Sequence, residues 1–393
     1  MFESLAHYTS DGRGFIDVRT SESHGGSYRG VWPMGPLSSM VASHLNKRSY
    51  ERFVVKDPMQ PFEVYFRLFD SFVPNLEEIH DTSRTNNKLL TKHKITRTYA
   101  APGVQEQEVW TGRLRGTLYI PPGNTRFPGV LSISGAHPGA FKHKAAILAS
   151  HGFVALAVRY FGTDDLPKYD HGLDLGYFEE AAIFLKNHTS VDARNGVGIV
   201  SNCVGASASL GIASCAPEGL FGCVVAISGW YVSYNTFTYR DKTWSVPETF
   251  TLNAESLPDG TMVITSSHPD AENETWENIE DDLVPFQQRH RTAYMFVYGG
   301  KDTIHETIIQ KMGKHAREML EEQHHPRYEL LFYPDAGHLI EHAYAPHQNV
   351  VWTYRQLQHN GGNQPDHSKA QEDSWPKILN FLRQSLTSTP AKL

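Results

Sequence analysis

A strand, a sharp turn and a helix follow one another in the segment Gly196-Val197-Gly198-Ile199-Val200-Ser201-Asn202-Cys203-Val204-Gly205-Ala206-Ser207. Residues 197–200 are β-formers, and the small-residue run 206–213 is typical of a closely packed helix. Between them, Ser201-Asn202-Cys203-Val204-Gly205 matches the layout of the nucleophile elbow G-x-S-x-G, with cysteine as the nucleophile and serine for the first glycine. Small residues are needed at both ends of this turn, because a larger side chain would clash where strand and helix approach. The segment therefore predicts a strained turn that presents Cys203.

An isolated cysteine is more often a small buried apolar residue than a nucleophile. The surroundings of Cys203 favour the second interpretation, because predicted strands and helices alternate from residue 111 onward. Such alternation predicts the α/β class, with a parallel sheet and right-handed crossovers. The predicted strands are 114–120, 130–133, 154–158, 197–200, 293–298 and 328–333, and the predicted helices are 141–150, 173–187, 206–213, 307–322 and 371–386.

The composition is that of a folded globular chain. Its 393 residues include 40% hydrophobic residues, and the net charge of -7 gives no reason to expect nucleic acid as a partner. No apolar run is long enough to span a membrane, and the first residues lack the basic and apolar regions of a signal peptide. The three cysteines, Cys203, Cys215 and Cys223, lack C-x-x-C spacing, so we expect neither a disulfide framework nor a structural zinc site.

We divide the chain into three parts. Residues 1–110 are rich in β-formers, for example at Phe62–Phe69, and predict a small β-sandwich domain. Residues 111–388 carry the alternating α/β pattern, and 389–393 are expected to form a flexible tail. Residues 231–290 interrupt the alternation with polar, aromatic and acidic residues, which fits a lid or pocket wall and an irregular surface excursion equally well. The glycine-rich stretch 25–36 is no phosphate loop, because no lysine follows its glycines at the required spacing.

A cysteine nucleophile needs a base, and the base needs an acid that orients it. After an elbow of this kind the acid precedes the histidine in the chain. Asp302 follows the predicted strand 293–298 and His338 follows 328–333, so both fall at the carboxyl edge of the sheet, as Cys203 does. We assign Asp302 as the acid and His338 as the base. Asp335 is the rival acid, but it lies too close to His338 in the same turn to brace its ring.

Two further features concern the chemistry around Cys203. The oxyanion hole is expected to use the backbone N–H of Val204 and a second N–H from the loop after an early strand, at Ala136 or, as a close alternative, Gly135. The run from His338 to His342 also matches the inverted zinc motif H-x-x-E-H. That motif needs a helix to place both histidines on one face, and the nearby proline and glycine favour a loop followed by a short helix instead.

The residues now quoted carry a specific resemblance. The chain resembles the family of acyl-CoA thioesterases and bile acid-CoA:amino acid N-acyltransferases. The matching stretches are Gly25–Gly35, Gly112–Gly123, Asp165–Pro167, Tyr177–Ala182, the elbow, Ala336–Glu341 and Ser368–Trp375, which run in order along nearly the whole chain. The resemblance implies an α/β-hydrolase domain preceded by a β-sandwich, which is shorter here than is usual in the family, so that one or two strands are expected to be missing. It also implies a triad of Cys203, Asp302 and His338.

The resemblance further implies acyl-CoA as the substrate, with coenzyme A as part of that substrate and no other cofactor. Serine is associated with the thioesterases of the family and cysteine with its amino acid acyltransferases, so either water or glycine or taurine could accept the acyl group; we favour hydrolysis modestly. A dienelactone-hydrolase-like activity also uses an elbow cysteine, but it would leave the N-terminal module unexplained. A non-catalytic acyl-CoA or lipid-binding protein is the contrasting alternative, and Ser201 in place of glycine is the feature that favours it.

The last three residues, Ala391-Lys392-Leu393, resemble the peroxisomal address Ser-Lys-Leu. A proline and a Ser/Thr run precede them, which predicts an exposed tail that an import receptor could read. We therefore expect a peroxisomal location and a peroxisomal import receptor as a partner, with a random tail and a cytoplasmic location as the alternative.

Overall fold

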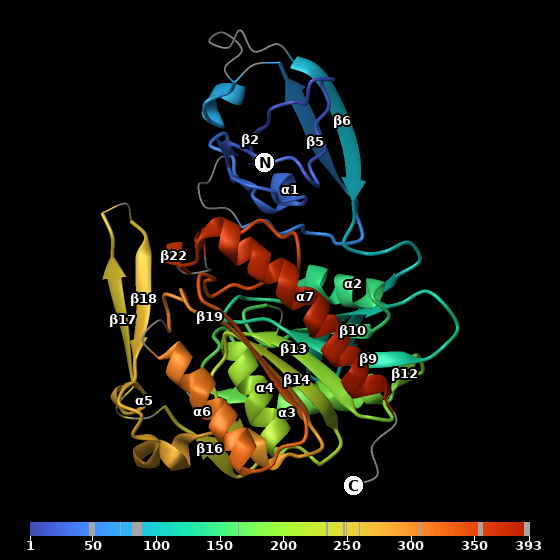
Figure 1. Ribbon diagram of the computed structural model, residues 1–393. Helices are drawn as coiled ribbons and strands as arrows, with labels where there is room; N and C mark the ends of the chain where they lie inside the picture. The colour runs from blue at the N-terminus through green and yellow to red at the C-terminus, as the bar shows by residue number, and fades with distance from the viewer. Residues whose placement is uncertain are drawn as a thin grey trace.

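The structure is a computed structural model, shown in Figure 1. It describes residues 1–46, 52–70, 72–80, 89–163, 165–232, 235–246, 248, 250–258, 260–305, 308–352 and 357–388. The expected targeting residues Ala391, Lys392 and Leu393 lie outside these described residues, so their role stays a prediction. None of the helices in the described parts has both the length and the apolar character needed to cross a bilayer.

A nine-stranded sheet forms the centre of the larger, C-terminal part of the chain. Its strands run in the order β20-β19-β14-β13-β9-β10-β8-β7, and the short β12 also pairs with β9. The strands from β20 to β10 are parallel to their neighbours, while β8 and β7 are antiparallel. The bounds are β7 Gln105–Thr111, β8 Leu114–Ile120, β9 Phe127–Ile133, β10 Val154–Arg159, β12 Val191–Asp192, β13 Val197–Asn202, β14 Phe221–Ile227, β19 Ala293–Gly299 and β20 Tyr328–Tyr333.

Helices cover both faces of this sheet, and each face has its own apolar core (Figure 1). On one face lie α3 (Gly176–Lys186), α4 (Val204–Cys215) and α6 (Ile309–Glu322), and on the other lie α2 (Lys142–Ser150) and α7 (Gln364–Thr387). The central strands are buried on both faces, which explains why β14 is a continuous apolar run and why β13 carries no polar side chain before Ser201. The α/β-hydrolase architecture expected from the sequence is confirmed.

Two predicted helices begin three or more residues from the expected position, whereas the other three begin within two residues of it. The helix expected at 173–187 starts only at Gly176, because Leu173–Asp174 form the short strand β11, which pairs with β15 (Phe237–Tyr239). The last helix starts at Gln364 rather than residue 371, with Pro365 in its first turn, where a missing N–H has no cost. The earlier start of α7 adds about two turns, which include His367.

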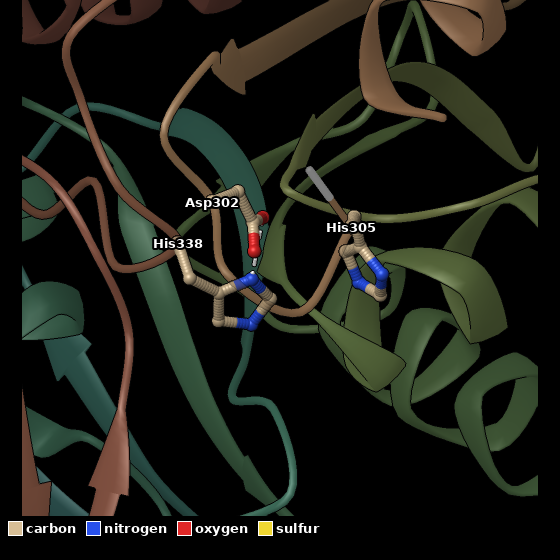
Figure 2. Close-up of side chains that lie close together, drawn as sticks. All are labelled: Asp302, His305 and His338. Atoms are coloured by element: carbon tan, nitrogen blue, oxygen red, sulfur yellow. Dashed lines mark hydrogen bonds and ion pairs between the residues drawn. The ribbon is translucent and has the colours of Figure 1, made fainter. Parts of the chain in front are cut away.

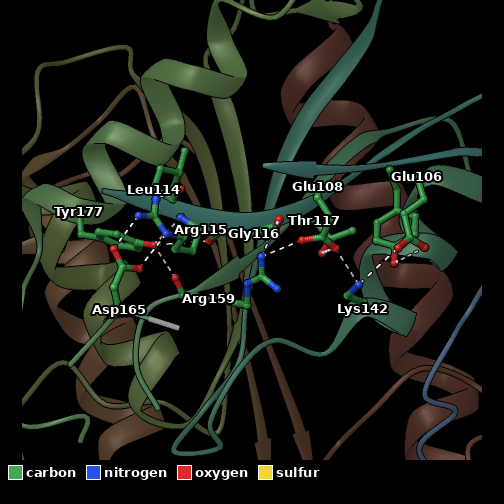
Figure 3. Close-up of polar contacts among 11 residues, drawn as sticks. Glu106, Glu108, Leu114, Arg115, Gly116, Thr117, Lys142, Arg159, Asp165 and Tyr177 are labelled. Carbon is green, nitrogen blue, oxygen red and sulfur yellow. Dashed lines mark hydrogen bonds and ion pairs between the residues drawn. The ribbon is translucent and has the colours of Figure 1, made fainter. Parts of the chain in front are cut away.

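Strand β7 was not expected, because its sequence is polar. It pairs with β8 as the outer strand of the sheet and is held by charged contacts that Figure 3 shows. The carboxylate of Glu108 accepts hydrogen bonds from Thr117 at 2.8 Å, from Lys142 at 2.9 Å and from Arg159 at 2.7 Å. A second cluster in Figure 3 joins Arg115 to Asp165 by two hydrogen bonds of 2.8 and 2.7 Å. Both clusters fasten the antiparallel edge to the parallel part of the sheet.

The N-terminal region consists of small antiparallel sheets of two strands each, at the top of Figure 1. Its contacts with α7 join it to the rest of the chain: Glu372 accepts hydrogen bonds from the Trp32 indole at 3.0 Å and from the Ser38 hydroxyl at 2.6 Å. The elements are β1 Phe2–Glu3 with β4 Val41–Ala42, β2 Ala6–His7 with β3 Gly25–Gly26, β5 Phe62–Phe69 with β6 Leu89–Arg97, the one-turn helix α1 Gly35–Ser38 and the 3-10 turn η1 Glu77–Ile79.

The described parts of residues 231–290 form a layer that contributes several side chains to the core on one face of the main sheet. Its hairpin, β17 and β18, joins β22 and β21 in a four-stranded sheet that stands at one side of the molecule in Figure 1. The elements are β15 Phe237–Tyr239, β16 Lys242–Trp244, β17 Thr251–Ser256, β18 Met262–Ser267, α5 Pro269–Glu272, the 3-10 turns η2 Trp276–Asp282 and η3 Phe286–Gln288, β21 Val350–Trp352 and β22 Leu357–His359.

Candidate active site

Cys203 occupies the turn between β13 and α4. Its backbone angles are φ 52° and ψ -129°, a strained conformation for a residue with a side chain. A Cβ added to Gly205 would lie 2.2 Å from the carbonyl oxygen of Ser134, so only glycine fits there. Ser201 is fully buried, and its hydroxyl donates a 3.2 Å hydrogen bond to the carbonyl of Val225. The turn therefore has the predicted elbow geometry, and the serine that replaces the usual glycine is accommodated.

The loop expected to supply the second oxyanion donor lies directly against Cys203. A Cβ added to Gly135 would lie 2.8 Å from the Cys203 Cβ, so glycine permits the close approach of this loop. The Tyr160 hydroxyl is within hydrogen-bonding distance of the carbonyls of Ser134 and Gly135, at 2.8 and 2.9 Å, and it fixes the peptide orientation. Val204 is the first residue of α4, so its N–H has no partner within the helix. Ala136 lies between these features and is exposed.

Asp302 and His338 meet as expected from their positions after β19 and β20. The His338 Nδ1–H donates to Asp302 Oδ2 at 2.7 Å, and both side chains are buried (Figure 2). The other carboxylate oxygen of Asp302 accepts a 3.0 Å hydrogen bond from the backbone N–H of Ile304. His338 also has a hydrogen bond with Cys203, so the three predicted residues form one chain of contacts. Asp335 is exposed on the same turn and is not the carboxylate that bonds His338.

The negative charge of Asp302 and the positive charge of His338 stabilise each other in the buried site. Burial alone would lower the pKa of His338, but the Asp302 carboxylate and Cys203 outweigh it and raise the pKa to about 10. Burial likewise opposes ionisation of Asp302, yet the neighbouring His338 and hydrogen bonds from His338 and from the Ile304 N–H lower its pKa. A positively charged His338 next to Cys203 favours the thiolate form of a cysteine, which is the nucleophilic form.

His305 is a site neighbour that the sequence reasoning missed. It lies beside Asp302 in Figure 2, and one nitrogen each of His305 and His338 and an oxygen of Asp302 lie within 4.8 Å of one another. Its ring contacts Trp230 at 4.2 Å between centroids, and its Nδ1 is 3.0 Å from the Ser266 hydroxyl of β18. Burial lowers the pKa of His305 to about 3, so the ring is neutral. This contact joins the layer of residues 231–290 to the loop that carries Asp302.

The inverted zinc motif does not take the form that metal binding would need. Residues 337–349 form a loop without the short helix that we expected after His338, so His338 and His342 do not share a helix face. Glu341 is paired with the cations Lys144 and Arg52, and the His342 Nδ1 contacts the carbonyl of its neighbour Ala343 at 2.9 Å.

A buried ion pair lies behind the elbow and was also missed. The Lys144 ammonium donates to Asn202 Oδ1 at 2.6 Å and lies 3.0 Å from the carboxylate of Glu341. The exposed fractions of the two charged side chains are 2% and 10%. Arg52, from the N-terminal region, bonds the other oxygen of Glu341. Since Asn202 directly precedes Cys203, this cluster connects the nucleophile turn to the His338 loop and to the N-terminal region.

Comparison with known proteins places the chain in a family. Residues 173–388 match the family model described as "BAAT / Acyl-CoA thioester hydrolase C terminal", and residues 1–111 match the "Acyl-CoA thioester hydrolase/BAAT N-terminal region". The chain is 34% identical to human "Bile acid-CoA:amino acid N-acyltransferase", over 98% of this chain and 88% of that protein.

Two mouse relatives carry different activities in their names. The chain is 31% identical to "Acyl-coenzyme A amino acid N-acyltransferase 2" and 29% identical to "Acyl-coenzyme A thioesterase 5", in both cases over 100% of this chain and 90% of the relative. With both family models matched and similarity along the whole chain, this protein belongs to the BAAT / acyl-CoA thioester hydrolase family.

Proposed function

We propose that this chain cleaves acyl-CoA thioesters through an acyl group carried on Cys203. The observation that carries the proposal is the chain of contacts from Asp302 through His338 to Cys203 at a strained elbow. The names of the relatives support acyl-CoA as the substrate class.

In the first step the Cys203 thiolate attacks the carbonyl carbon of the thioester, and its proton is held by His338. Asp302 holds the imidazolium in place. The backbone N–H of Val204 and that of Ala136 or Gly135 bind the oxyanion of the tetrahedral intermediate. The bond to the CoA sulfur then breaks, His338 returns its proton to that sulfur, and CoA leaves as a thiol. The acyl-enzyme is itself a thioester.

In the second step we propose that water is the acceptor. His338 takes a proton from water, hydroxide adds to the acyl carbon, and the bond to Cys203 breaks to release a fatty acid. Transfer to the amine of glycine or taurine is the second candidate. One specific observation favours it, because the nucleophile is cysteine and a thioester reacts readily with amines. The transferase names of two of the relatives described above point the same way.

The test is CoA release from a series of acyl-CoAs, with and without glycine or taurine, followed by identification of the acyl product by mass. A free acid in every case supports hydrolysis, whereas an N-acyl amino acid supports transfer. The Cys203→Ala variant should lose turnover by several orders of magnitude while keeping its fold. Cys215→Ala is the matched control and should retain activity, because Cys215 lies at the far end of α4, the helix that begins directly after Cys203. Full activity of Cys203→Ala would overturn the assignment.

A further inference from the structure

The loop that carries His338 is held on both sides by one side chain of α7. The Nδ1 atom of His367 accepts a 2.9 Å hydrogen bond from the backbone N–H of Gly337. Its Nε2–H donates a 2.9 Å hydrogen bond to the carbonyl of Leu339. The two bonded residues flank His338 directly in the chain. A single imidazole therefore fixes the backbone immediately before and immediately after the proposed base.

Both bonds require one particular form of the His367 ring. Nδ1 must keep its lone pair and Nε2 must carry a hydrogen, so the ring must be neutral and in the Nε2–H tautomer. The side chain is fully buried, and burial lowers its pKa to about 4, in agreement with a neutral ring. His347 stacks on it with 3.6 Å between ring centroids and 13° between ring planes, which restricts rotation of the ring.

A second side chain of α7 repeats the arrangement one turn later. Gln371 lies four residues after His367 and therefore on the same face of the helix. Its Oε1 accepts a 3.0 Å hydrogen bond from the backbone N–H of Glu341, and its Nε2 donates a 2.8 Å bond to the carbonyl of Ala345. Gln371 is 1% exposed, so water does not compete for these bonds. The next stretch of the same loop is thus held by the same helix.

The backbone of His338 itself is held by two other segments, the one after β14 and the one after β22. Its backbone carbonyl accepts a 2.7 Å hydrogen bond from the Ser228 hydroxyl, after β14, and its N–H donates to the carbonyl of Asn360 at 2.8 Å. These bonds fix residue 338 itself, but the direction in which the loop enters and leaves it depends on residues 337 and 339. A tilt of the imidazole by a small angle would lengthen its contact with Cys203.

We propose that His367 and Gln371 are positioning residues, which set the reach of His338 toward Cys203 from the first turns of α7. The proposal rests on the proposed function, because that function makes His338 the base. Misplacement of a reacting group by about 1 Å costs on the order of 100-fold in rate. We expect the rate of reaction at Cys203 to fall about 10- to 100-fold when the two hydrogen bonds between His367 and residues 337 and 339 are removed.

The experiment measures the rate at which iodoacetamide alkylates Cys203, as a function of pH, by mass analysis of the peptide that contains it. In His367→Leu the rate at neutral pH should fall about 10- to 100-fold, and the pH at which the thiol becomes reactive should rise. His367→Asn, whose amide oxygen can replace the acceptor Nδ1, should recover part of the rate. Gln371→Leu should give a smaller change of the same sign and replaces His367→Leu if that variant does not fold.

Leu382→Ala is the matched control, because Leu382 is a fully buried residue of α7 about four turns after His367 and packs beside Gly198 of β13. It should lower stability without moving the pH profile of alkylation. A pH profile of the His367 and Gln371 variants that coincides with that of the unaltered chain would overturn the proposal, as would an equal shift in Leu382→Ala.

The outcome is separable from that of the acyl-CoA assignment. If the variants shift the profile and no acyl-CoA is cleaved, the positioning role stands and the substrate class is wrong. If Cys203-dependent CoA release is found and the variants keep both rate and profile, the positioning role is wrong. If Cys203 of the unaltered chain reacts like a free cysteine, His338 does not activate it and the positioning role is overturned as well.

Discussion

Replacement of Lys144 by methionine should destabilise the fold strongly. Methionine keeps most of the apolar stem but removes the ammonium that bonds Asn202 and Glu341. Loss of one member of a buried ion pair costs about 3–5 kcal/mol, because the other charge stays buried without its partner. Arg52 still bonds Glu341, so we expect the lower end, about 3 kcal/mol in the free energy of unfolding.

The measurement is urea unfolding at neutral pH, followed by tryptophan fluorescence. Lys142→Met is the matched control, two residues earlier in the same helix. Its side chain is 30% exposed and its ammonium pairs with two glutamates at the sheet edge, so the loss of that group should cost only about 0–1 kcal/mol. The double variant Lys144→Met with Glu341→Gln should recover part of the loss, because the uncompensated carboxylate is then gone. The reasoning would be refuted if Lys144→Met lowered the free energy of unfolding by less than about 1 kcal/mol, or if the effect of the double variant equalled the sum of the effects of Lys144→Met and Glu341→Gln.

The same pair predicts a pH dependence. Burial would raise the pKa of Glu341, but Lys144 and Arg52 outweigh it and hold the pKa well below its ordinary value of 4.5. The folded state therefore binds a proton less readily than the unfolded state, and this contribution to stability is present above pH 4.5 and is lost as the pH falls further. In Glu341→Gln the stability should depend less steeply on pH in this acidic range.

Three further predictions concern the elbow and its surroundings. Gly205→Ala should abolish CoA release and, in urea unfolding, destabilise the fold by more than about 2 kcal/mol, because its Cβ would clash with the Ser134 carbonyl. Gly313→Ala is the control: its Cβ would meet other atoms no closer than 3.6 Å, so it should be neutral or stabilise the fold by up to about 1 kcal/mol. Because the pKa of His338 is raised, its pairing with Asp302 stabilises the fold fully below pH 6.5, and this stabilisation is lost as the pH rises through about 10. Asp302→Asn should remove most of this pH dependence. An equal fall of the thermal unfolding midpoint with rising pH in the variant and in the unaltered chain would contradict it. Tyr160→Phe removes the hydroxyl donor from the buried Ser134 carbonyl, while the Gly135 carbonyl keeps the N–H of His137 at 2.7 Å. The change should cost about 1–3 kcal/mol in unfolding and slow CoA release, so an unchanged release rate would speak against a role for that loop in the oxyanion hole.

The sequence predicted the central sheet and the elbow because both depend on local chemistry. Buried parallel strands are continuous apolar runs, and the strained turn at Cys203 demands a glycine at position 205, which the chain has. The positions of Asp302 and His338 followed from strand ends, since the carboxyl ends of parallel strands meet at one edge. The two residues are 36 positions apart in the chain and still meet at 2.7 Å.

The residues that support the site could not be predicted in this way. A lysine in a helix is usually solvated, and nothing near Lys144 in the chain indicates that Glu341 and Asn202 will enclose it. Strand β7 was missed because, as an outer strand with most residues exposed, it has no need of apolar alternation. His367 lay outside the predicted last helix, and its partners are 30 and 28 residues earlier in the chain.

Helix α7 has a consequence for how the protein is made. It follows the elbow and the His338 loop in the chain, and synthesis proceeds from the N-terminus. While the ribosome is still adding residues 364–387, Cys203 and His338 have already been made, but the helix that contacts the N-terminal region through Glu372 is not yet in place. On the role proposed for His367, the Cys203 thiol of a chain that lacks α7 reacts about 10- to 100-fold more slowly than that of the complete protein. Docking of α7 would then be the last step that brings Cys203 to its full reactivity, after the elbow and the His338 loop have been made.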